Sequence, residues 1–365
     1  MIRNHRDGPR RRLQASSAVL HSALLMTLPL LQACSAVAPT PTTASMQQPA
    51  HAPLPKETAF AVAANASSPV GDEITARIVA SVDGLALVDH HGLPSIRIAT
   101  AHSTAVVSLF GGQLLSFTPE GGTDALWLSP DTLPPPQPTR GGSPVIWPYF
   151  SRQGQTDALP AHGLVRTLPW TLLEASRDRQ GNIELLLAPP ALDGLPLQLR
   201  MRLHVGRSLR QQLITTNISA SPVIFTEALH NYLRVGDVSR VQVEGVDGTV
   251  YRNKGEPYSM ARAQHGTLAL AAFADSGIDR IYRRTDGQYQ LLDPSLQRRI
   301  SLRTTGSNSL VTWNAGRGAE TRSQDIGPGW RHYLCLETAN VGQDVVTLAP
   351  GARHVMGQQI SVEPL

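Results

Sequence analysis

Residues 197–217 read LQLRMRLHVGRSLRQQLITTN, and the pattern of this stretch decides the fold. Over Leu197–Val205 every second residue is apolar, and the residues between them are Gln, Arg or His. This period of two is typical of a β-strand with one buried face and one face in water. Gly206 then supplies a turn into a second run that ends at Asn217. The stretch therefore predicts two strands joined by a turn.

Similar short runs recur along the chain, separated by Gly, Pro, Asp and Asn. They lie at residues 105–117, 170–174, 183–187, 238–243, 300–303, 310–313, 333–337, 345–348 and 355–362. No long window favours a helical period, and β texture is expected from about Ile74 onward. A length of 365 residues would allow two domains, but one large β domain is equally permitted. The sequence predicts an all-β sandwich.

The first 33 residues predict a signal peptide rather than part of the fold. Five arginines lie among the first twelve residues, and an apolar run follows at 18–31. His21 and Pro29 interrupt that run, which is too short for a transmembrane helix. It ends in LQAC, which resembles a lipoprotein cleavage site, so Cys34 is the predicted lipidation site and membrane anchor. An ordinary signal peptide, or an amino-terminal extension with a misplaced start, would fit the same segment.

Residues 34–72 are rich in Ala, Pro, Thr and Ser and have little apolar periodicity. This composition predicts a disordered tether, which leaves residues 73–365 as the folded domain. A basic leader, an apolar run, LQAC and a tether follow one another in the order that export requires. The domain is therefore expected to face the periplasm from a membrane, with a cytoplasmic location as the alternative.

The net charge of the chain comes entirely from the leader. Its five arginines and Asp7 carry a net charge of +4, which equals the formal charge of the whole chain. The remainder is therefore neutral, and no basic face remains to suggest a nucleic-acid partner.

The cysteine and histidine residues predict neither a disulfide nor a metal site. With Cys34 lipidated, Cys335 has no intramolecular partner, and its two leucine neighbours indicate a small buried apolar residue. The twelve histidines lack metal-ligand spacing. The sequence contains no HExxH, paired CxxC, P-loop or GxGxxG after a strand, so no cofactor is expected.

Residues 140–166 read RGGSPVIWPYFSRQGQTDALPAHGLVR and predict the ligand-binding part of the chain. Arg140 precedes two glycines, which allow close backbone approach or a positive φ. His162 lies four residues ahead of Arg166. Two guanidinium groups brought together match an anion or a row of sugar hydroxyls. Composition alone would also fit a surface loop with two solvated arginines.

RGGSPVIWP at 140–148 and LPAHGLVRTLPW at 159–170 resemble the signature of the hexose-6-phosphate mutarotases (glucose-6-phosphate 1-epimerases), a branch of the aldose 1-epimerase superfamily. Further matching motifs, in the same order, are GGQLLS (111–116), LWLS (126–129), ALHNY (228–232), IDRIY (278–282), WN (313–314) and CLE (335–337). The resemblance covers roughly the last three quarters of the chain. It implies a large antiparallel β-supersandwich, galactose mutarotase-like, with its site in a concave sheet face.

By motif position the resemblance implies that His230 is a general acid and Glu337 a general base. In mutarotation the acid protonates the ring oxygen of an aldose while the base accepts the proton of the C1 hydroxyl, and each group typically contributes about 10²–10⁴-fold. No metal, nucleotide or covalent intermediate is required. Taken alone, a histidine on a β face or a glutamate on an edge strand would more often be structural.

The resemblance also implies a set of substrate-binding residues. Arg140 and Arg166 would bind the substrate, with a phosphate as their partner. Asp279 would accept hydrogen bonds from sugar hydroxyls, although an ion pair with Arg280 or a turn position would also fit it. His162 would orient the sugar near C1, or stabilise the loop before Gly163. Some family members carry a glutamine at the position of Ala161.

Three functions fit these residues, each with a small-molecule sugar or sugar phosphate as partner. The first is an isomerase that acts as a hexose-6-phosphate mutarotase. The second is a mutarotase for unphosphorylated or uronic aldoses in the periplasm, and the third is a non-catalytic carbohydrate-binding module. Binding alone needs no acid–base pair, which favours an enzyme. A glycoside hydrolase would need a second placed carboxylate, and nothing in the sequence marks one.

Overall fold

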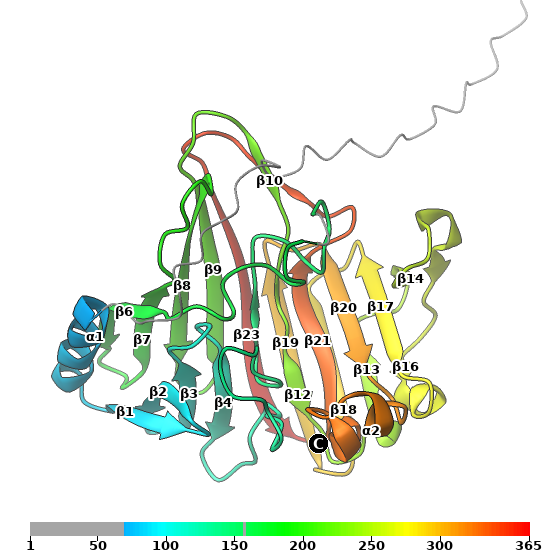
Figure 1. The fold of residues 1–365 in the computed structure, drawn as a ribbon. Helices are drawn as coiled ribbons and strands as arrows, with labels where there is room; N and C mark the ends of the chain where they lie inside the picture. Colours follow the sequence, from blue (N-terminus) through cyan, green and yellow to red (C-terminus); the bar gives the residue numbers. More distant parts are fainter. Residues whose placement is uncertain (1–68, 156–157) are drawn as a thin grey trace, which may run out of the picture. The chain divides into compact units, whose positions relative to one another are not determined.

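The computed structural model describes residues 69–155 and 158–365, and the predicted signal peptide, Cys34 and nearly all of the predicted tether lie outside this part. Two large antiparallel sheets and one four-stranded sheet form the described domain (Figure 1). The predicted all-β fold class, a large antiparallel supersandwich, is confirmed.

The nine-stranded sheet has the order β16 (Leu268–Ala269), β13 (Gln242–Glu244), β18 (Gln288–Asp293), β19 (Arg298–Thr305), β23 (Arg353–Pro364), β9 (Leu209–Asn217), β8 (Leu197–Val205), β7 (Ile183–Ala188), β6 (Thr171–Arg177). The eight-stranded sheet has the order β15 (Arg262–Ala263), β14 (Val250–Asn253), β17 (Ile278–Arg283), β20 (Ser309–Asn314), β21 (Tyr333–Asn340), β11 (Glu227–Leu229), β5 (Val145–Ile146), and β12 (Tyr232–Arg234) also pairs with β21.

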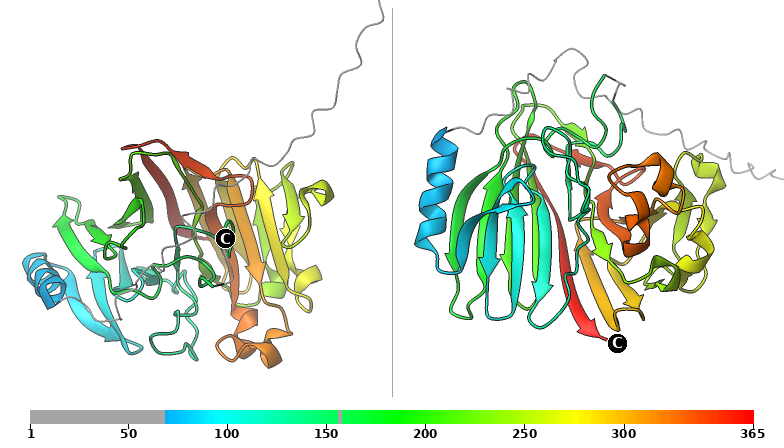
Figure 2. Two further views of the ribbon diagram at one scale, coloured as in Figure 1. Left: turned by 45° about the horizontal axis from the view of Figure 1, so that its top comes forward. Right: turned by 60° about the horizontal axis from the view of Figure 1, so that its bottom comes forward.

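Two smaller sheets complete the fold. The four-stranded sheet runs β1 (Leu85–His90), β2 (Leu93–Ala99), β3 (Ser103–Ser108), β4 (Leu114–Pro119), and β10 (Val223–Phe225) pairs with β22 (Val346–Leu348). The four-stranded sheet covers the part of the nine-stranded sheet that contains β7 to β9 (Figure 2). The helical segments are α1 (Pro69–Ser81), α2 (Ala319–Arg322), η1 (Val238–Arg240), η2 (Tyr258–Met260), η3 (Leu270–Phe273) and η4 (Gly327–His332).

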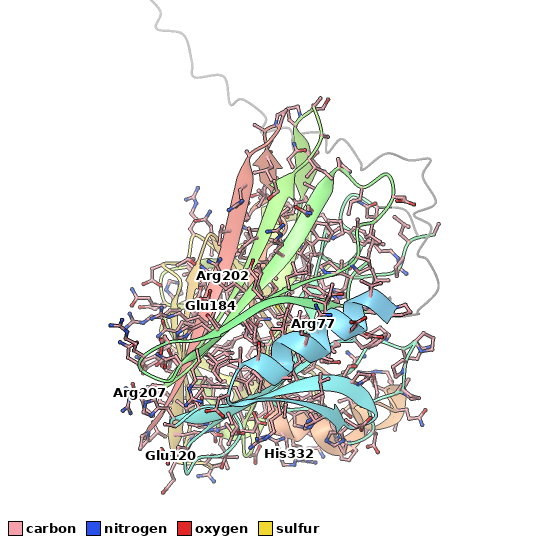
Figure 3. The ribbon with its side chains drawn as sticks, turned by 90° about the vertical axis from the view of Figure 1, so that its left-hand side faces the viewer. Arg77, Glu120, Glu184, Arg202, Arg207 and His332 are labelled. Atoms are coloured by element: carbon pink, nitrogen blue, oxygen red, sulfur yellow. The ribbon has the colours of Figure 1, made fainter. Side chains whose placement is uncertain are left out.

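The stretch at 197–217 forms β8 and β9 with the predicted bounds. Every apolar position of β8 is buried, and its polar positions are exposed or half-buried. On the polar face Arg202 lies 3.4 Å from Glu184 of β7, and Figure 3 shows the two side chains close together. On the other face the leucines and Met201 join the main hydrophobic core. The alternation thus places the core between the sheets.

Three expectations about local structure were wrong. β texture was expected from Ile74, but residues 69–81 form helix α1. The β-branched Thr75 and Val79 stand four positions apart, so the helix buries both of them on one face. The run at 105–117 is split into β3 and β4 around Gly111, whose φ is 79°. The run at 238–243 begins as the 3₁₀ helix η1, capped by Asp237.

Cys335 lies in β21 as a free, fully buried cysteine, which confirms its prediction as a small core residue. Within the described ranges no helix is both long and apolar enough to cross a membrane.

Candidate active site

His230 and Glu337 face each other across two paired strands. Leu229 pairs with Thr338 of β21 at the end of β11, and Tyr232 pairs with Cys335 at the start of β12. The same register places His230 opposite Glu337. His230 Nε2 lies 3.3 Å from Glu337 Oε1. The sequence separates these side chains widely, and the strand register brings them together.

Both members of this pair favour their neutral forms. Burial holds the pKa of His230 well below its usual value, and the charges of Arg140 and Arg166 lower it further. Burial raises the pKa of Glu337 well above its usual value, and nearby Asp279 raises it more. The resting pair is therefore a protonated Glu337 beside a neutral His230 and carries no net charge, because an ion pair in this dry site would lose its solvation. Glu337 Oε2 is buried and has no hydrogen-bond partner among the described residues.

Arg140 is fixed in place by two partners. Its Nε donates to Asp325 Oδ2 at 2.8 Å, and its Nη1 donates to Tyr232 Oη at 3.0 Å. Burial opposes the charge of Arg140, but Tyr232 and Asp325 more than compensate and raise its pKa. Arg140 is therefore a permanent cation, and its Nη2 has no hydrogen-bond partner in the part of the chain that the structure describes.

The backbone beside Arg140 adopts conformations that only glycine takes readily. Gly141 and Gly142 have φ of 106° and 62°, as their pairing in the sequence allows. A Cβ at Gly141 would overlap the carbonyl oxygen of Trp127, and a Cβ at Gly142 would overlap that of Leu114. The close approach is thus to neighbouring backbone, and it holds the Arg140 loop against the sheet.

Arg166 lies beside Arg140 in a shared pocket. Its Nη2 donates to the carbonyl oxygen of Ala161 at 2.8 Å, and burial lowers its pKa. The pocket has a volume of about 200 Å³. Its polar lining consists of Gln137, Thr139, Arg140, His162, Arg166, His230, Tyr232 and Asp325. Both predicted arginines and the predicted acid therefore face one small space.

His162 connects the arginine pocket to the His230–Glu337 pair. Its ring lies edge-on to His230 at 5.8 Å and edge-on to Phe150 at 5.0 Å. Burial, followed by the charge of Arg166, lowers the pKa of His162 to about 3, so the ring is neutral at physiological pH. Its φ is 66°, and Gly163 follows in the same left-handed region.

Asp279 lies on the other side of Glu337 from the arginines. It pairs with Trp313 of β20, which in turn pairs with Cys335 of β21, so all three share one row of the sheet. Asp279 Oδ2 lies 3.5 Å from Lys254 Nζ. Its partner is therefore Lys254, and the guanidinium of Arg280 instead stacks over the ring of Tyr251 at 4.0 Å.

Three residues of the site escaped the sequence analysis: Tyr232, Asp325 and Lys254. Tyr232 had a signal in its position two residues after His230, since alternate residues share a strand face. Lys254 also had one, because it is the only lysine after Lys56 in a chain otherwise rich in arginine. Asp325 had none, because 185 positions separate it from Arg140.

Two tryptophans lie in or near the site, and one of them is a core residue. Trp147 is buried and donates from Nε1 to Thr215 Oγ1 at 3.0 Å, which makes it a core residue. Trp313 lies edge-on to His230 at 6.1 Å and borders the His230–Glu337 pair. Within the part that the structure describes, no three His, Cys, Asp or Glu side chains are grouped to hold a metal ion.

The fold and the family comparison together define an epimerase. The model of the aldose 1-epimerase family matches residues 94–361. The chain belongs to the aldose 1-epimerase family and is an isomerase.

Two named proteins and one crystal structure illustrate this similarity. The chain is 31% identical over 262 residues to a protein of Escherichia coli K12 named "Putative glucose-6-phosphate 1-epimerase". The alignment covers 70% of this chain and 82% of that protein. A protein of the same name from Cenchrus ciliaris is 27% identical over 263 residues, covering 68% and 78%. The crystal structure of a putative mutarotase, YeaD, from Salmonella typhimurium matches with a TM-score of 0.69 at 26% identity, covering 77% of this chain and 94% of that one.

Proposed function

We propose that this protein interconverts the α and β anomers of a hexose 6-phosphate, with His230 as general acid and Glu337 as general base. The observation that carries the proposal is the 3.3 Å contact between these two side chains at the edge of a pocket lined by Arg140 and Arg166. His230 lines the same pocket as the two arginines, and Glu337 contacts His230 directly.

The chemistry needs two proton transfers and one bond cleavage. Glu337 accepts the proton of the C1 hydroxyl while His230 gives a proton to the ring oxygen, and the bond between C1 and the ring oxygen breaks to leave an open-chain aldehyde. Rotation about C1–C2 presents the other carbonyl face, and the reverse transfers close the ring. No atom of the protein becomes covalently attached.

The direct contact between His230 and Glu337 explains how the neutral resting pair becomes an acid and a base. The proton of Glu337 first moves to His230, which gives the carboxylate and the imidazolium that ring opening uses. Because Glu337 Oε1 lies 3.3 Å from His230 Nε2, this proton can move without passing through bulk water. Ring opening leaves Glu337 protonated and His230 neutral, and the reverse transfers of ring closure restore the carboxylate and the imidazolium.

The pocket charges support a phosphorylated substrate. Arg140 and Arg166 contribute two positive charges and Asp325 one negative charge, so the pocket is a net cation. Among the described residues, some N–H groups of both guanidinium groups have no hydrogen-bond partner. Charge-assisted hydrogen bonds to phosphate are among the stronger polar contacts. On the opposite side, Asp279 and Lys254 suit the hydroxyl groups of the sugar ring.

The leader supports a second candidate. A lipoprotein facing the periplasm would meet free hexose phosphates rarely, so the same pocket would then take an unphosphorylated or uronic aldose, whose carboxylate the arginines would bind. A non-catalytic carbohydrate-binding module is disfavoured, because simple binding gives no reason to bury an acid and a base in contact.

The test follows α-to-β exchange by NMR exchange spectroscopy on glucose, glucuronate and glucose 6-phosphate. Glu337→Gln and His230→Ala should each slow exchange by about 10²-fold or more. The matched control is Glu227→Gln, since Glu227 is equally buried on β11 but points to Thr215 in the core. Wild-type rates in both Glu337→Gln and His230→Ala, with folding confirmed, would rule out these residues as the base and the acid. Faster exchange of glucuronate than of glucose 6-phosphate would favour the second candidate.

We propose in addition that Cys34 is lipidated and anchors the domain to a membrane. The support is the order of basic segment, apolar run, LQAC and tether. Native protein and Cys34→Ala are expressed and the cells fractionated. Export predicts membrane-bound native protein with a diacylglyceryl-modified amino terminus. Unmodified Cys34 in cytosolic protein that keeps Met1 would refute it.

A further inference from the structure

Asn231 stands between His230 and Tyr232, and its side chain is buried in the core between the two large sheets. Its Nδ2 donates to the carbonyl oxygen of Leu336 at 2.9 Å and to Gln358 Oε1 at 2.7 Å. Its Oδ1 accepts from Ser143 Oγ at 2.7 Å and from Gln358 Nε2 at 2.7 Å. All four hydrogen-bonding positions of the amide are therefore used.

Gln358 extends this arrangement across the sandwich. It lies on β23 of the nine-stranded sheet, whereas Asn231 belongs to the sheet that carries the site. Gln358 Oε1 also accepts from Thr338 Oγ1 at 2.8 Å, and Gln358 Nε2 also donates to Gln211 Oε1 at 3.1 Å. None of these side chains is more than 4% exposed. Two amides, each fully paired, thus tie the two sheets together directly behind His230.

The orientation of both amides follows from one fixed group. The carbonyl oxygen of Leu336 can only accept, so the atom of Asn231 that faces it must be Nδ2. That choice requires Gln358 to present Oε1 to Asn231 Nδ2 and Nε2 to Asn231 Oδ1. The network therefore has one hydrogen-bonding arrangement, which makes it rigid.

The backbone ladder is interrupted at the same place. The N–H of Asn231 bonds to the carbonyl oxygen of Leu229 at 3.1 Å instead of crossing to β21. The N–H of His230 bonds to Pro144 on the other side at 3.0 Å. The carbonyl oxygen of Leu336, which faces this gap, takes the side-chain amide of Asn231 instead. Beside His230, between β11 and β12, the side chain of Asn231 therefore holds the chain to β21 in place of a backbone hydrogen bond.

We propose that Asn231 is a positioning residue: through its pairing with Gln358, it sets the distance and angle between His230 and Glu337. This inference rests on the proposed acid–base function of that pair. Displacing a catalytic group by about 1 Å can cost about 10²-fold in rate, so a loosened strand would act on turnover rather than on sugar binding. Neither Asn231 nor Gln358 lines the pocket.

The chain offers a matched control in Asn217 on β9. Asn217 is also fully buried, and its Nδ2 donates to the carbonyl oxygens of Ser221 and Leu348 at 2.8 and 2.9 Å. Its Oδ1 accepts from the backbone and the hydroxyl of Ser219. Asn217→Ala therefore removes as many hydrogen bonds as Asn231→Ala, but beside the β10–β22 pair and away from the site.

The experiment compares Asn231→Ala, Gln358→Met and Asn217→Ala in the full chain. Thermal unfolding should show that both asparagine variants lose stability. The kcat for anomer exchange should fall about 10- to 100-fold in Asn231→Ala and Gln358→Met, with KM changed less than about 2-fold, and stay near wild type in Asn217→Ala. Gln358→Met keeps the volume of the side chain and tests the idea if Asn231→Ala fails to fold. Equal kcat per folded molecule in all three variants would overturn the inference.

A second readout does not depend on turnover. The imidazole resonances of His230, assigned with His230→Ala, should shift in Asn231→Ala and Gln358→Met but remain in place in Asn217→Ala. Wild-type protein that exchanges none of the sugars would defeat the proposed function, and the resonances would still report on positioning. Unshifted His230 resonances in both network variants would overturn the positioning role whether or not the enzyme is active.

Discussion

The imidazole of His230 lies flat on the ring of Tyr232, with ring centroids 5.0 Å apart and an interplanar angle of 16°. The hydroxyl of the same tyrosine accepts a hydrogen bond from Arg140 Nη1 at 3.0 Å. One buried side chain therefore contacts both the proposed acid and the proposed phosphate ligand. A movement of the Arg140 guanidinium on anion binding would therefore also move the ring of Tyr232, which stacks on His230.

Tyr232→Phe should separate these two contacts. The phenylalanine keeps the stacked ring but removes the acceptor of Arg140, and a hydrogen bond to a charged group contributes about 1.5–3 kcal/mol. We expect KM for glucose 6-phosphate to rise about 10-fold or more while kcat changes little. Steady-state kinetics would test this, with Tyr289→Phe on the nine-stranded sheet as control. If only kcat fell, the hydroxyl of Tyr232 would be shown to support His230 rather than Arg140.

Arg166→Ala should weaken phosphorylated substrates far more than neutral ones. One charge-assisted contact contributes about 1.5–3 kcal/mol, so kcat/KM for glucose 6-phosphate should fall about 10- to 150-fold. Arg140→Ala should do the same, but it also leaves Asp325 without its ion-pair partner, which makes Arg166→Ala the cleaner change. The exposed Arg202→Ala serves as control. Equal losses for glucose and glucose 6-phosphate would assign hydroxyl binding or a structural role to the arginines.

Phosphate binding should raise the pKa of His230. Burial is the main cause of its low pKa, and the charges of Arg140 and Arg166 add to it. A bound dianion neutralises these charges and so favours the imidazolium that ring opening requires. NMR titration of His230 with and without inorganic phosphate would measure the shift. An unchanged pKa in phosphate-saturated protein would mean that the anion docks elsewhere.

Glu227 should make the protein lose stability as the pH rises towards 8. Burial raises the pKa of this core carboxyl to about 8 from its ordinary value of 4.5, although a hydrogen bond from Thr215 partly opposes the shift. Between these values the folded state holds a proton that the unfolded state has released. The free energy of unfolding therefore falls as pH rises from about 4.5 to 8. Denaturant unfolding across this range should show a flatter pH dependence in Glu227→Gln. An identical slope in both proteins would mean that Glu227 does not titrate in this way.

The sequence predicts local features of this fold better than distant ones. The alternation over β8 specified that strand to the residue, because it buries one face and exposes the other, and Gly206 marked the turn into β9. Helix α1 was missed because its buried pair, Thr75 and Val79, is β-branched and its apolar face is short.

The candidate site divides in the same way. The family motifs placed Arg140, Arg166 and His230 in the sequence, and the fold brings all three to one pocket. The residues that hold these side chains in place could not be predicted from the sequence. Asp325 meets Arg140 from a segment 185 residues away, and such a contact depends on how the sheets pack rather than on any local pattern.

The position of β23 has a consequence for how the protein is made. This strand follows the other eight strands of the nine-stranded sheet in the sequence, yet it lies between β19 and β9 in the middle of that sheet. The ribosome therefore releases the joining strand only after the other eight, and until then the two halves of the sheet have open edges that invite aggregation. A chain cut before Arg353 would lack both the strand that joins the two halves and Gln358, which pairs with Asn231. Synthesis of this protein closes the nine-stranded sheet only when this twelve-residue strand is delivered.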